Sequence, residues 1–509
     1  MDLIKQIFDS GVVGCGGAGF STHVKLKGSP GNLIFKGGGS ETPLWTDRYM
    51  MNHLGCKLGA RVEQDCSGFP THVKLKASPE ILIINGAECE PLLRTDRYLM
   101  IHEAEKLVSG VDLICRELSI PEGRIALKKT YTKEIEALTA AIEKLHSKVQ
   151  LHLMDSFYPA GDEQVVVYEV TGKVVPPAGI PLDVGAIVDN VATIIAVADA
   201  VSGIPFTEKY LTVTGEVREP SVLKVPVGTS FAQCIEIAGG TTSDKVMVVS
   251  GGPMMGAPMS WEAAMNASVT KTTSGILVLP EDGAIDRRRK TQLNHMLNRA
   301  KAACIQCTFC TQLCPRHMLG HPLQPHRIMR KMAMNMPHQD NNETTKDHWI
   351  LPELLEDKDI RQAAICSECG VCEVYACPMG LQPRVVNSLI KGELAQAGIR
   401  YSREGDTWEA DANRPYRKVP TKRIAARAGV GAYYHIDGHT YKEETASKVV
   451  LPLKMNIGVP AEPVISDGAH VEKGQLIAAC PEGKLGANLH ASISGTAHLT
   501  GNAITITEV

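Results

Sequence analysis

Eight cysteines between residues 304 and 377 constrain this chain more than any other feature of its sequence. They fall into two sets, Cys304-x2-Cys307-x2-Cys310-x3-Cys314-Pro315 and Cys366-x2-Cys369-x2-Cys372-x4-Cys377-Pro378. Three thiolates at positions i, i+3 and i+6 of a tight loop can hold three irons of a cubane, and a fourth Cys followed by Pro supplies the last ligand. The pattern predicts two [4Fe–4S] clusters with these eight cysteines as ligands.

Zinc and disulfides are the alternatives to iron–sulfur clusters. Structural zinc sites usually carry their cysteines in pairs rather than in threes with a trailing Cys-Pro, so the spacing favours iron. In two-cluster ferredoxins the fourth cysteine of each set ligates the other cluster. Cys314 and Cys377 are therefore either exchanged between the clusters or not, and the sequence leaves both arrangements open.

The composition limits where such a protein works. A length of 509 residues allows three or four domains, and a formal net charge of -3 argues against bulk binding to nucleic acid or to an anionic membrane. No run approaches the roughly 20 apolar residues of a transmembrane helix, and we expect no signal peptide. Oxygen-sensitive clusters and scattered free thiols suit a reducing compartment, so we expect a cytoplasmic protein.

Two basic runs stand out, Arg287–Lys290 and Arg414–Arg427. One interpretation is a pair of solvated faces beside a linker. The other is a docking patch for an acidic electron partner, because opposite charge steers association. The sequence does not decide between them.

A duplicated segment occupies the N-terminal region, at about 15–53 and 64–102. Phe20-Ser-Thr-His-Val-Lys-Leu-Lys27 recurs as Phe69-Pro-Thr-His-Val-Lys-Leu-Lys76, and Thr46-Asp-Arg-Tyr49 recurs as Thr95-Asp-Arg-Tyr98. Two copies are too few for a repeat fold. A tandem duplication is the favoured interpretation.

Each copy retains half of a site. Only the first has the glycine-rich loop Gly14-Cys-Gly-Gly-Ala-Gly19, which follows a helix predicted over 2–9, and only the second has Asn85-Gly-Ala-Glu-Cys-Glu-Pro91. Glycines let the backbone approach a phosphate or a flavin closely. We expect a composite site built from both copies, with residues 28–66 as an excursion from the fold.

These motifs resemble the flavin- and NADH-binding fold shared by the flavoprotein subunit of complex I and the RnfC protein of the Rnf complex. The same families have counterparts of two later segments, Tyr158-Pro-Ala-Gly-Asp-Glu-Gln164 and Asp189-Asn-Val-Ala-Thr193. The resemblance implies a Rossmann-like α/β domain over 1–205 that binds FMN and NADH. Within it, periodicity predicts helices over 103–118 and 133–147 and β-rich runs at Gln150–Met154 and Gln164–Tyr168.

The resemblance also implies roles for single residues. The glycine loop would lie over the isoalloxazine and the nucleotide, and Lys25 or Lys74 would neutralise the FMN phosphate. Glu88 and Glu90 would line the nicotinamide pocket and orient it, as the residues closest to catalysis. The implied cofactor-binding residues are Gly14, Gly16, Gly17, Gly19, Phe20, Lys25, Lys74, Asn85, Tyr158, Gly161, Glu163, Asn190 and Thr193. The alternative for Tyr158 is a plain core residue.

The rest of the chain divides into four further parts. We expect a β-grasp module of the SLBB type over 206–260, a linker helix and an α-helical two-cluster ferredoxin-like domain over 261–400, a polar and basic linker over 401–445, and a barrel-sandwich hybrid over 446–509. The linker helix is predicted at 286–303. The last part resembles lipoyl and biotinyl carriers but has no lysine in the turn Ala491–Gly495, so a structural or docking role is expected.

This order of domains indicates electron transfer, because a hydride donor gives two electrons, a flavin can separate them and clusters carry them singly. The C-terminal barrel-sandwich and the x4 spacing before Cys377 resemble the PduS-type cobalamin reductases of propanediol-utilisation microcompartments more than RnfC. This resemblance implies an NADH-dependent reductase of corrin cobalt inside a microcompartment. Its candidate partners are a corrin or a protein electron acceptor, an adenosyltransferase and the microcompartment shell.

Two alternatives remain open at this stage. The first is an RnfC-like electron-transfer protein that feeds ferredoxin or a glycyl-radical activase. The second, from another class, is a non-catalytic microcompartment interaction protein with structural clusters. No motif in the sequence recognises a corrin, so the sequence does not name the acceptor.

Overall fold

The computed structural model describes residues 2–17, 19–27, 79–335, 350, 352–403, 405, 407–434 and 439–508, and the backbone of two short strands, β1 (Leu33–Ile34) and β2 (His72–Val73). These two strands pair in antiparallel fashion. Lys74 lies outside the described residues. So does the predicted excursion over 28–66, apart from the backbone of β1. Within the described part, no helix is long and apolar enough to cross a membrane.

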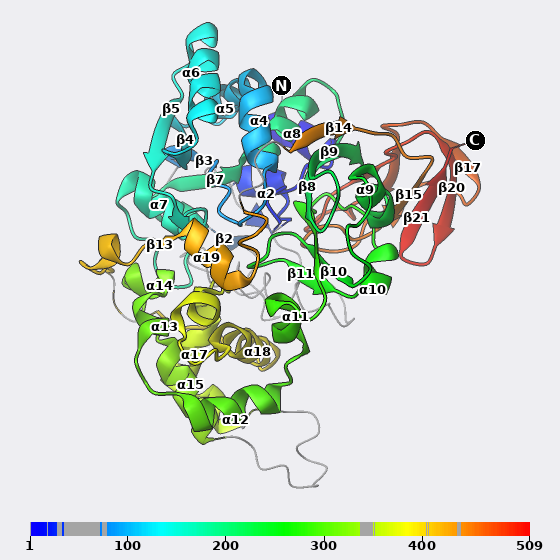
Figure 1. Cartoon of the computed structure of the whole chain (residues 1–509). Coiled ribbons are helices and arrows are strands. Elements are labelled where there is room, and N and C mark those ends of the chain that lie inside the picture. The colour runs from blue at the N-terminus through cyan, green and yellow to red at the C-terminus, as the bar shows by residue number, and fades with distance from the viewer. Residues whose placement is uncertain are drawn as a thin grey trace.

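A parallel four-stranded sheet forms the core of the N-terminal part (Figure 1). Its order is β5-β4-β3-β7, with β3 (Ile81–Asn85), β4 (Glu122–Lys128), β5 (Gln150–Met154) and β7 (Ala186–Asn190). Leu82 and Ile84 face one group of buried helices, and Ile81 and Ile83 face another, as expected of apolar parallel strands covered on both sides. The helices of this part are α1 (Leu3–Asp9), α2 (Thr22–Leu26), α4 (Thr95–His102), α5 (Ala104–Glu117), α6 (Thr132–Leu145), α7 (Glu163–Thr171), the 3₁₀ turn η1 (Pro181–Val184) and α8 (Val191–Val201).

Helices α5 and α6 and strand β5 confirm three predicted elements, whereas α7 corrects a fourth. The valine-rich run Gln164–Tyr168, predicted as β-rich, is helical. The Asp162 carboxylate accepts hydrogen bonds from the backbone N–H groups of Gln164 and Val165, at 3.1 and 3.2 Å, and caps the first turn. The valines of this helix pack against the face of the sheet that carries Ile81 and Ile83. Capping and burial outweigh the β propensity of the valines.

A six-stranded mixed sheet follows, in the order β11-β10-β12-β8-β9-β14. It consists of β8 (Glu208–Gly215), β9 (Ser221–Pro226), β10 (Val246–Ser250), β11 (Ala257–Met259), β12 (Gly275–Pro280) and β14 (Thr440–Glu443), with helices α9 (Phe231–Ile237) and α10 (Trp261–Met265). The sheet extends past the predicted module over 206–260, because β12 lies between β10 and β8. It also takes its edge strand β14 from the predicted linker, in parallel with β9.

The two cysteine sets lie in a helical domain at the bottom of Figure 1. Its elements are α11 (Ala284–Lys290), α12 (Leu293–Ala303), α13 (Phe309–Gln312), α14 (Pro315–Met318), α15 (Pro325–Met334), α16 (Pro352–Leu355), α17 (Lys358–Arg361), the 3₁₀ turn η3 (Gln362–Ile365), the π-helical turn η4 (Cys372–Ala376) and α18 (Pro383–Gln396). The predicted helix over 286–303 is two helices, because the backbone is extended at Thr291 and Gln292.

The last ligand of each cysteine set is reached by a different turn. In the first set, the N–H of Cys314 donates to the carbonyl of Thr311 at 3.0 Å. In the second set, the N–H of Cys377 donates to the carbonyl of Cys372 at 3.1 Å, a five-residue hydrogen bond of the π-helical kind. This π turn accommodates the additional residue of the x4 spacing.

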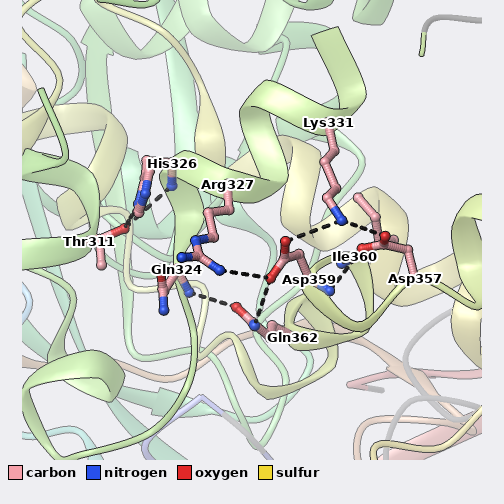
Figure 2. Close-up of polar contacts among 9 residues, drawn as sticks. All are labelled: Thr311, Gln324, His326, Arg327, Lys331, Asp357, Asp359, Ile360 and Gln362. Atoms are coloured by element: carbon pink, nitrogen blue, oxygen red, sulfur yellow. Dashed lines mark hydrogen bonds and ion pairs between the residues drawn. The ribbon is translucent and has the colours of Figure 1, made fainter. Parts of the chain in front are cut away.

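A polar network ties α15 to the first cysteine set and to the segment that precedes the second (Figure 2). The Thr311 hydroxyl and His326 Nδ1 lie 2.7 Å apart. At the other end of α15, Lys331 Nζ lies 3.2 Å from Asp359 Oδ2 and also pairs with Asp357. The network thereby links the two cysteine loops through one helix.

The predicted linker over 401–445 is a structured arm. It contains the 3₁₀ turn η5 (Arg414–Tyr416), β13 (Val419–Pro420), α19 (Thr421–Ala428) and β14. Strand β13 pairs with β6 (Phe157–Tyr158) of the N-terminal part. The arm therefore adds one strand to each of two domains.

Two small sheets form the C-terminal part, at the right of Figure 1. Their strands are β15 (Lys448–Pro452), β16 (Glu462–Pro463), β17 (Ala469–Val471), β18 (Leu476–Ala479), β19 (Leu489–His490), β20 (Gly495–Thr500) and β21 (Ala503–Thr507). Val449, Ile477 and Ile504 share one buried core with Leu3 and Ile7 of α1. The C-terminal part is therefore packed against the start of the chain.

Candidate functional site

The parallel sheet offers a binding position at the ends of β3 and β7. The chain runs outward from β3 to β4 and β5, and then returns to place β7 on the other side of β3. In open α/β sheets, ligands bind at the carboxyl ends of the strands where the strand order reverses in this way. Asn85 and Asn190 are the last residues of β3 and β7, and they are direct partners in the parallel register.

The glycine-rich loop of the first copy reaches this edge of the sheet. It is closed by a hydrogen bond from the N–H of Gly14 to the carbonyl of Phe20, at 2.8 Å. A Cβ on Gly16 would lie 3.4 Å from the side chain of Asn190. At Gly17, φ is +101° and no atom lies within 4 Å of where a Cβ would be, so the loop is open on that side.

Three other parts of the chain hold the loop from behind. Thr193, in α8, accepts a hydrogen bond at its Oγ1 from the N–H of Cys15 at 2.9 Å. Lys209, in β8, donates to the Cys15 carbonyl at 3.1 Å. The N–H of Ile457, in the C-terminal part, donates to the carbonyl of Gly19 at 3.0 Å. The C-terminal part thus contacts the loop directly.

The two asparagines anchor segments around the edge. Asn85 Nδ2 donates to the carbonyl of Gly161 at 2.8 Å. Asn190 Nδ2 donates to Asp96 Oδ2 at 2.7 Å, and its Oδ1 caps α8 by accepting from the N–H of Ala192 at 2.9 Å. The segment at Gly161 is tightly packed, since a Cβ there would lie 3.3 Å from Asn85 Oδ1.

Lys25 projects from α2 into an acidic pair. Its Nζ lies 3.1 Å from Glu163 Oε1 and 3.4 Å from Asp189 Oδ1. Burial acts to lower the pKa of Lys25, but the two carboxylates outweigh it and hold that pKa above its ordinary value. The second oxygen of Asp189 is buried with no hydrogen-bond partner among the described residues. The site therefore has a lysine held between two carboxylates, and an acceptor oxygen of Asp189 that no described residue uses.

The acidic motif holds neighbouring loops in place. Glu88 Oε1 accepts from the N–H of Asp96 at 2.9 Å, at the start of α4. The two oxygens of Glu90 accept from the N–H groups of Met254 and Met255, both at 2.9 Å. Burial raises the pKa of both carboxyls, that of Glu90 to about 7. Sequence reasoning missed this contact, although the glycine pair just before Met254 could have signalled a tight turn.

One short segment joins the sheet edge to the cysteine loops. Tyr158 is buried and its hydroxyl donates to the carbonyl of Cys369 at 2.7 Å. Four residues later, Asp162 makes two hydrogen bonds to Arg316, at 2.5 and 2.9 Å. Gly161, the partner of Asn85, lies between them. Both cysteine sets therefore contact the segment that packs on Asn85.

The structure groups the cysteines in the exchanged arrangement. Cys314 of the first set lines one small cavity together with three cysteines of the second set, Cys366, Cys369 and Cys372. Cys377 of the second set lies near Cys310 of the first set. Burial raises the pKa of Cys310 to about 12, and among the neighbouring charges Cys377 raises it most, ahead of Cys304 and Cys307. The fourth cysteine of each set thus lies with the other three.

The surroundings of the sulfur atoms fit iron–sulfur clusters. The side-chain amide of Gln306 donates to the sulfur of Cys304 at 2.9 Å. The backbone N–H of Glu368 donates to the sulfur of Cys366 at 3.4 Å, and that of Leu381 to the sulfur of Cys377 at 3.3 Å. Such hydrogen bonds are a common feature of cluster sites.

Four family models match successive parts of the chain. They are the Nuo51 FMN-binding domain over residues 62–199, the SLBB domain over 210–258, the 4Fe-4S dicluster domain over 303–382 and the RnfC barrel sandwich hybrid domain over 438–505. The predicted multidomain α/β fold class, the FMN-binding domain and the two-cluster domain are confirmed.

Relatives match over nearly the whole chain. The cobalamin reductase PduS of Citrobacter freundii is 39% identical over 99% of this chain and 95% of its own, and that of Salmonella typhimurium is 40% identical over 99% and 96%. The C component of the proton-translocating ferredoxin:NAD(+) oxidoreductase complex of Clostridium ljungdahlii is 33% identical over 62% of this chain and 56% of its own. The domain order, the cysteine geometry and the full-length similarity to PduS together show that the chain belongs to the PduS cobalamin reductase family.

Proposed function

We propose that this protein is an NADH-dependent flavin and iron–sulfur oxidoreductase that reduces the cobalt of cobalamin. The observation that carries the proposal is the segment from Tyr158 to Asp162. This segment contacts Asn85 at the sheet edge and, through Tyr158 and Asp162, both cysteine loops. A flavin at the edge would lie one segment away from the clusters.

The residues at the edge fit FMN. When bound, FMN accepts a hydride pair from NADH and releases electrons singly. We propose that Gly14, Gly16, Gly17 and Gly19 offer open backbone to the cofactor. Lys25, rather than Lys74, supplies the positive charge near its phosphate. The further residues in contact with it are Phe20, Asn85, Tyr158, Gly161, Glu163, Asn190 and Thr193.

The flavin site is proposed to be composite. The glycine loop of the first copy and Asn85 of the second copy meet at one sheet edge, which supports a shared site. Glu88 and Glu90 then act as positioning residues. Glu88 fixes the start of α4, and Glu90 fixes the Met254 loop against the N-terminal part. Both keep the walls of the nicotinamide pocket in place.

Each cysteine group is proposed to hold one [4Fe–4S] cluster. Cys304, Cys307, Cys310 and Cys377 hold the first, and Cys366, Cys369, Cys372 and Cys314 hold the second. We also propose that the protein works in the cytoplasm inside a propanediol-utilisation microcompartment. There, an adenosyltransferase and the shell would be its neighbours. The relatives named cobalamin reductase PduS support this setting.

Anaerobic reduction of cobalamin tests the proposal. Protein purified without oxygen should contain one FMN and about eight irons, and NADH should reduce cob(III)alamin in a manner that depends on enzyme concentration. The variant Glu105→Gln, at an exposed ion pair on α5, serves as a matched control. Protein with its full iron and FMN content that oxidises NADH with an artificial dye but leaves cobalamin untouched would contradict the substrate.

The similarity to a component of a ferredoxin:NAD(+) oxidoreductase complex supports a second candidate, electron transfer to ferredoxin. The same assay with ferredoxin in place of cobalamin distinguishes the two.

A further inference from the structure

The fold brings Arg427, the end of the second basic run, against the first basic run, although the two are far apart in the sequence. Arg288, in α11, donates through Nη2 to the carbonyl of Arg427, in α19, at 3.3 Å. The helices are packed closely, because a Cβ on Gly429 would lie 3.0 Å from the Cβ of Ala284. Arg287 and Arg427 are both exposed. The end of the second run therefore shares one basic surface with the first run, whereas Arg414 and Lys418 pair with Glu169.

A cleft of about 720 Å³ opens within this surface. It is lined by Arg287, Arg288, Lys290, His295 and Arg299, with Gly380 and Gln382, and by no Asp or Glu among the described residues. Lys290 pairs with Asp282 and Asp286, and Arg288 lies near Glu373, whereas Arg287 and Arg299 have no ion pair among the described residues. The arginines instead donate to backbone carbonyls. The charge of Arg287 and Arg299 is thus not neutralised locally.

The cleft borders the first cysteine group. Arg299 Nη2 donates to the carbonyl of Met379 at 3.1 Å, two residues after Cys377. The loop of the first set also carries two large apolar side chains in solvent, Ile305 at 63% and Phe309 at 50% exposure. Exposed apolar side chains are enriched on protein-binding surfaces.

The first cysteine group is also the more accessible of the two. Cys304, Cys307, Cys310 and Cys377 are half-buried, whereas Cys314, Cys366, Cys369 and Cys372 are buried. The buried group is the one whose Cys369 carbonyl receives the Tyr158 hydroxyl. Electrons from the sheet edge would therefore reach the buried group first and leave from the accessible one.

We propose that an acidic one-electron carrier protein docks on this surface and exchanges electrons with the cluster of Cys304, Cys307, Cys310 and Cys377. The surface, here called the exit surface, comprises the cleft and Arg427. One electron passes between cluster and carrier, and no bond forms or breaks. The proposal deepens the proposed function by naming the partner class, and rests on it only for the presence of the clusters.

Charge reversal on the exit surface tests the proposal. Photoreduced flavodoxin, an acidic one-electron carrier, is mixed with oxidised, cluster-loaded protein in a stopped-flow instrument at several salt concentrations. The double variant Arg287→Glu/Arg427→Glu leaves Arg299, which supports the loop after Cys377, unchanged. It should slow electron transfer at low salt by about tenfold or more and remove the salt dependence, because steering by opposite charge raises association rates by such factors.

Three controls make the result specific. The neutral pair Arg287→Gln/Arg427→Gln should give an intermediate rate. Arg116→Glu, on an exposed position of α5 paired with its neighbour Glu117, should change nothing. Cytochrome c, a basic carrier, should accept electrons from the NADH-reduced Glu pair as fast as from the wild type, or faster.

An unchanged flavodoxin rate in the Glu pair would overturn the exit surface, as would equal slowing with both carriers at full iron content. Reduction of free cobalamin by NADH is measured separately. If cobalamin reduction fails while the flavodoxin effect holds, the proposed substrate is wrong and the exit surface stands. If cobalamin is reduced and charge reversal leaves the flavodoxin rate unchanged, the proposed substrate stands and the exit surface is wrong.

Discussion

The two cysteine loops share a sequence pattern but not an environment. The first loop is at the surface, with Ile305 and Phe309 in solvent. The second loop is enclosed by the N-terminal part through Tyr158, and by Lys391 of α18, which donates to the carbonyl of Cys366 at 2.8 Å. The spacing of the cysteines specifies what they bind, whereas the packing around them specifies where electrons enter and leave.

The two cysteine loops also differ in the charge of the groups that form hydrogen bonds around them. Around the second loop, Arg384 Nε donates to the buried Glu373 at 3.0 Å, and its Nη1 donates to the carbonyl of Met254. Buried charges next to a cluster are among the factors that set its reduction potential. The first loop has an uncharged donor, Gln306, at Cys304. We therefore expect clusters of unequal potential.

Removing one cysteine from each loop in turn should give the largest difference between the two loops in electron transfer. Cys369→Ala should stop electrons from NADH reaching any acceptor while flavin reduction continues, because the buried cluster lies between the flavin and the exit. Cys307→Ala should leave the buried cluster reducible by NADH but abolish delivery to carriers. Stopped-flow absorbance and EPR measure both. NADH-dependent turnover with a carrier in the Cys369 variant would contradict the order.

The ion pair between Asp162 and Arg316 tests how the N-terminal part holds the start of α14. Asp162→Asn keeps the cap of α7, because Asn caps as well as Asp, but breaks a buried ion pair. We expect a loss of about 3–5 kcal/mol in the free energy of unfolding. Glu105→Gln, which breaks an exposed pair with Lys144, should cost at most about 1 kcal/mol. Equal costs in denaturant melts would show that the buried pair is not essential.

A buried histidine should make the same junction sensitive to acid. His321 Nε2 lies 2.8 Å from the carbonyl of Val175, and burial, with the nearby Arg316, lowers the pKa of His321 to about 4. The unfolded chain then binds the proton more tightly, so this residue destabilises the fold as pH falls from about 6.5 to about 4, by up to about 1.4 kcal/mol per pH unit.

His321→Gln retains a donor for Val175 and does not titrate in this range. Its unfolding free energy should therefore fall less steeply with acid than that of the wild type. Parallel pH profiles for the two proteins would rule out the assignment.

The smallest effect is expected within the network of Figure 2. Thr311→Val removes the hydroxyl that contacts His326 Nδ1 and should cost about 1 kcal/mol of stability. A double-mutant cycle with His326→Ala isolates that contact, because the two changes should then be non-additive. Strict additivity would mean that the hydrogen bond contributes nothing to the support of the first loop.

The sequence predicted the parts that depend on local spacing. The two cysteine sets, the helices α5 and α6 and the strand β5 follow from short patterns. The exchange of Cys314 and Cys377 did not, because it depends on how two loops more than fifty residues apart pack. Likewise, Glu90 was expected in a nicotinamide pocket, but its partners are backbone N–H groups at Met254 and Met255, in another domain.

The basic runs show the same limit. Their charge is visible in the sequence, but Arg288 and Arg427 meet only because α19 folds back onto α11. Strand β14 was unpredictable for a related reason, since its partner β9 is distant in the chain. Contacts that close large loops leave no periodic signal in either segment.

The pairing of β6 with β13 has a consequence for how the protein is made. Tyr158 leaves the ribosome early, but its strand partner Val419 and the helix α19, which packs on the turn after Cys372, are synthesised much later. Until then the second cysteine loop is covered only by earlier parts of the chain, among them Tyr158 and Lys391. We therefore expect iron and sulfide to reach the deep position more easily during synthesis than after the arm has folded. The surface position should show no such dependence on the arm.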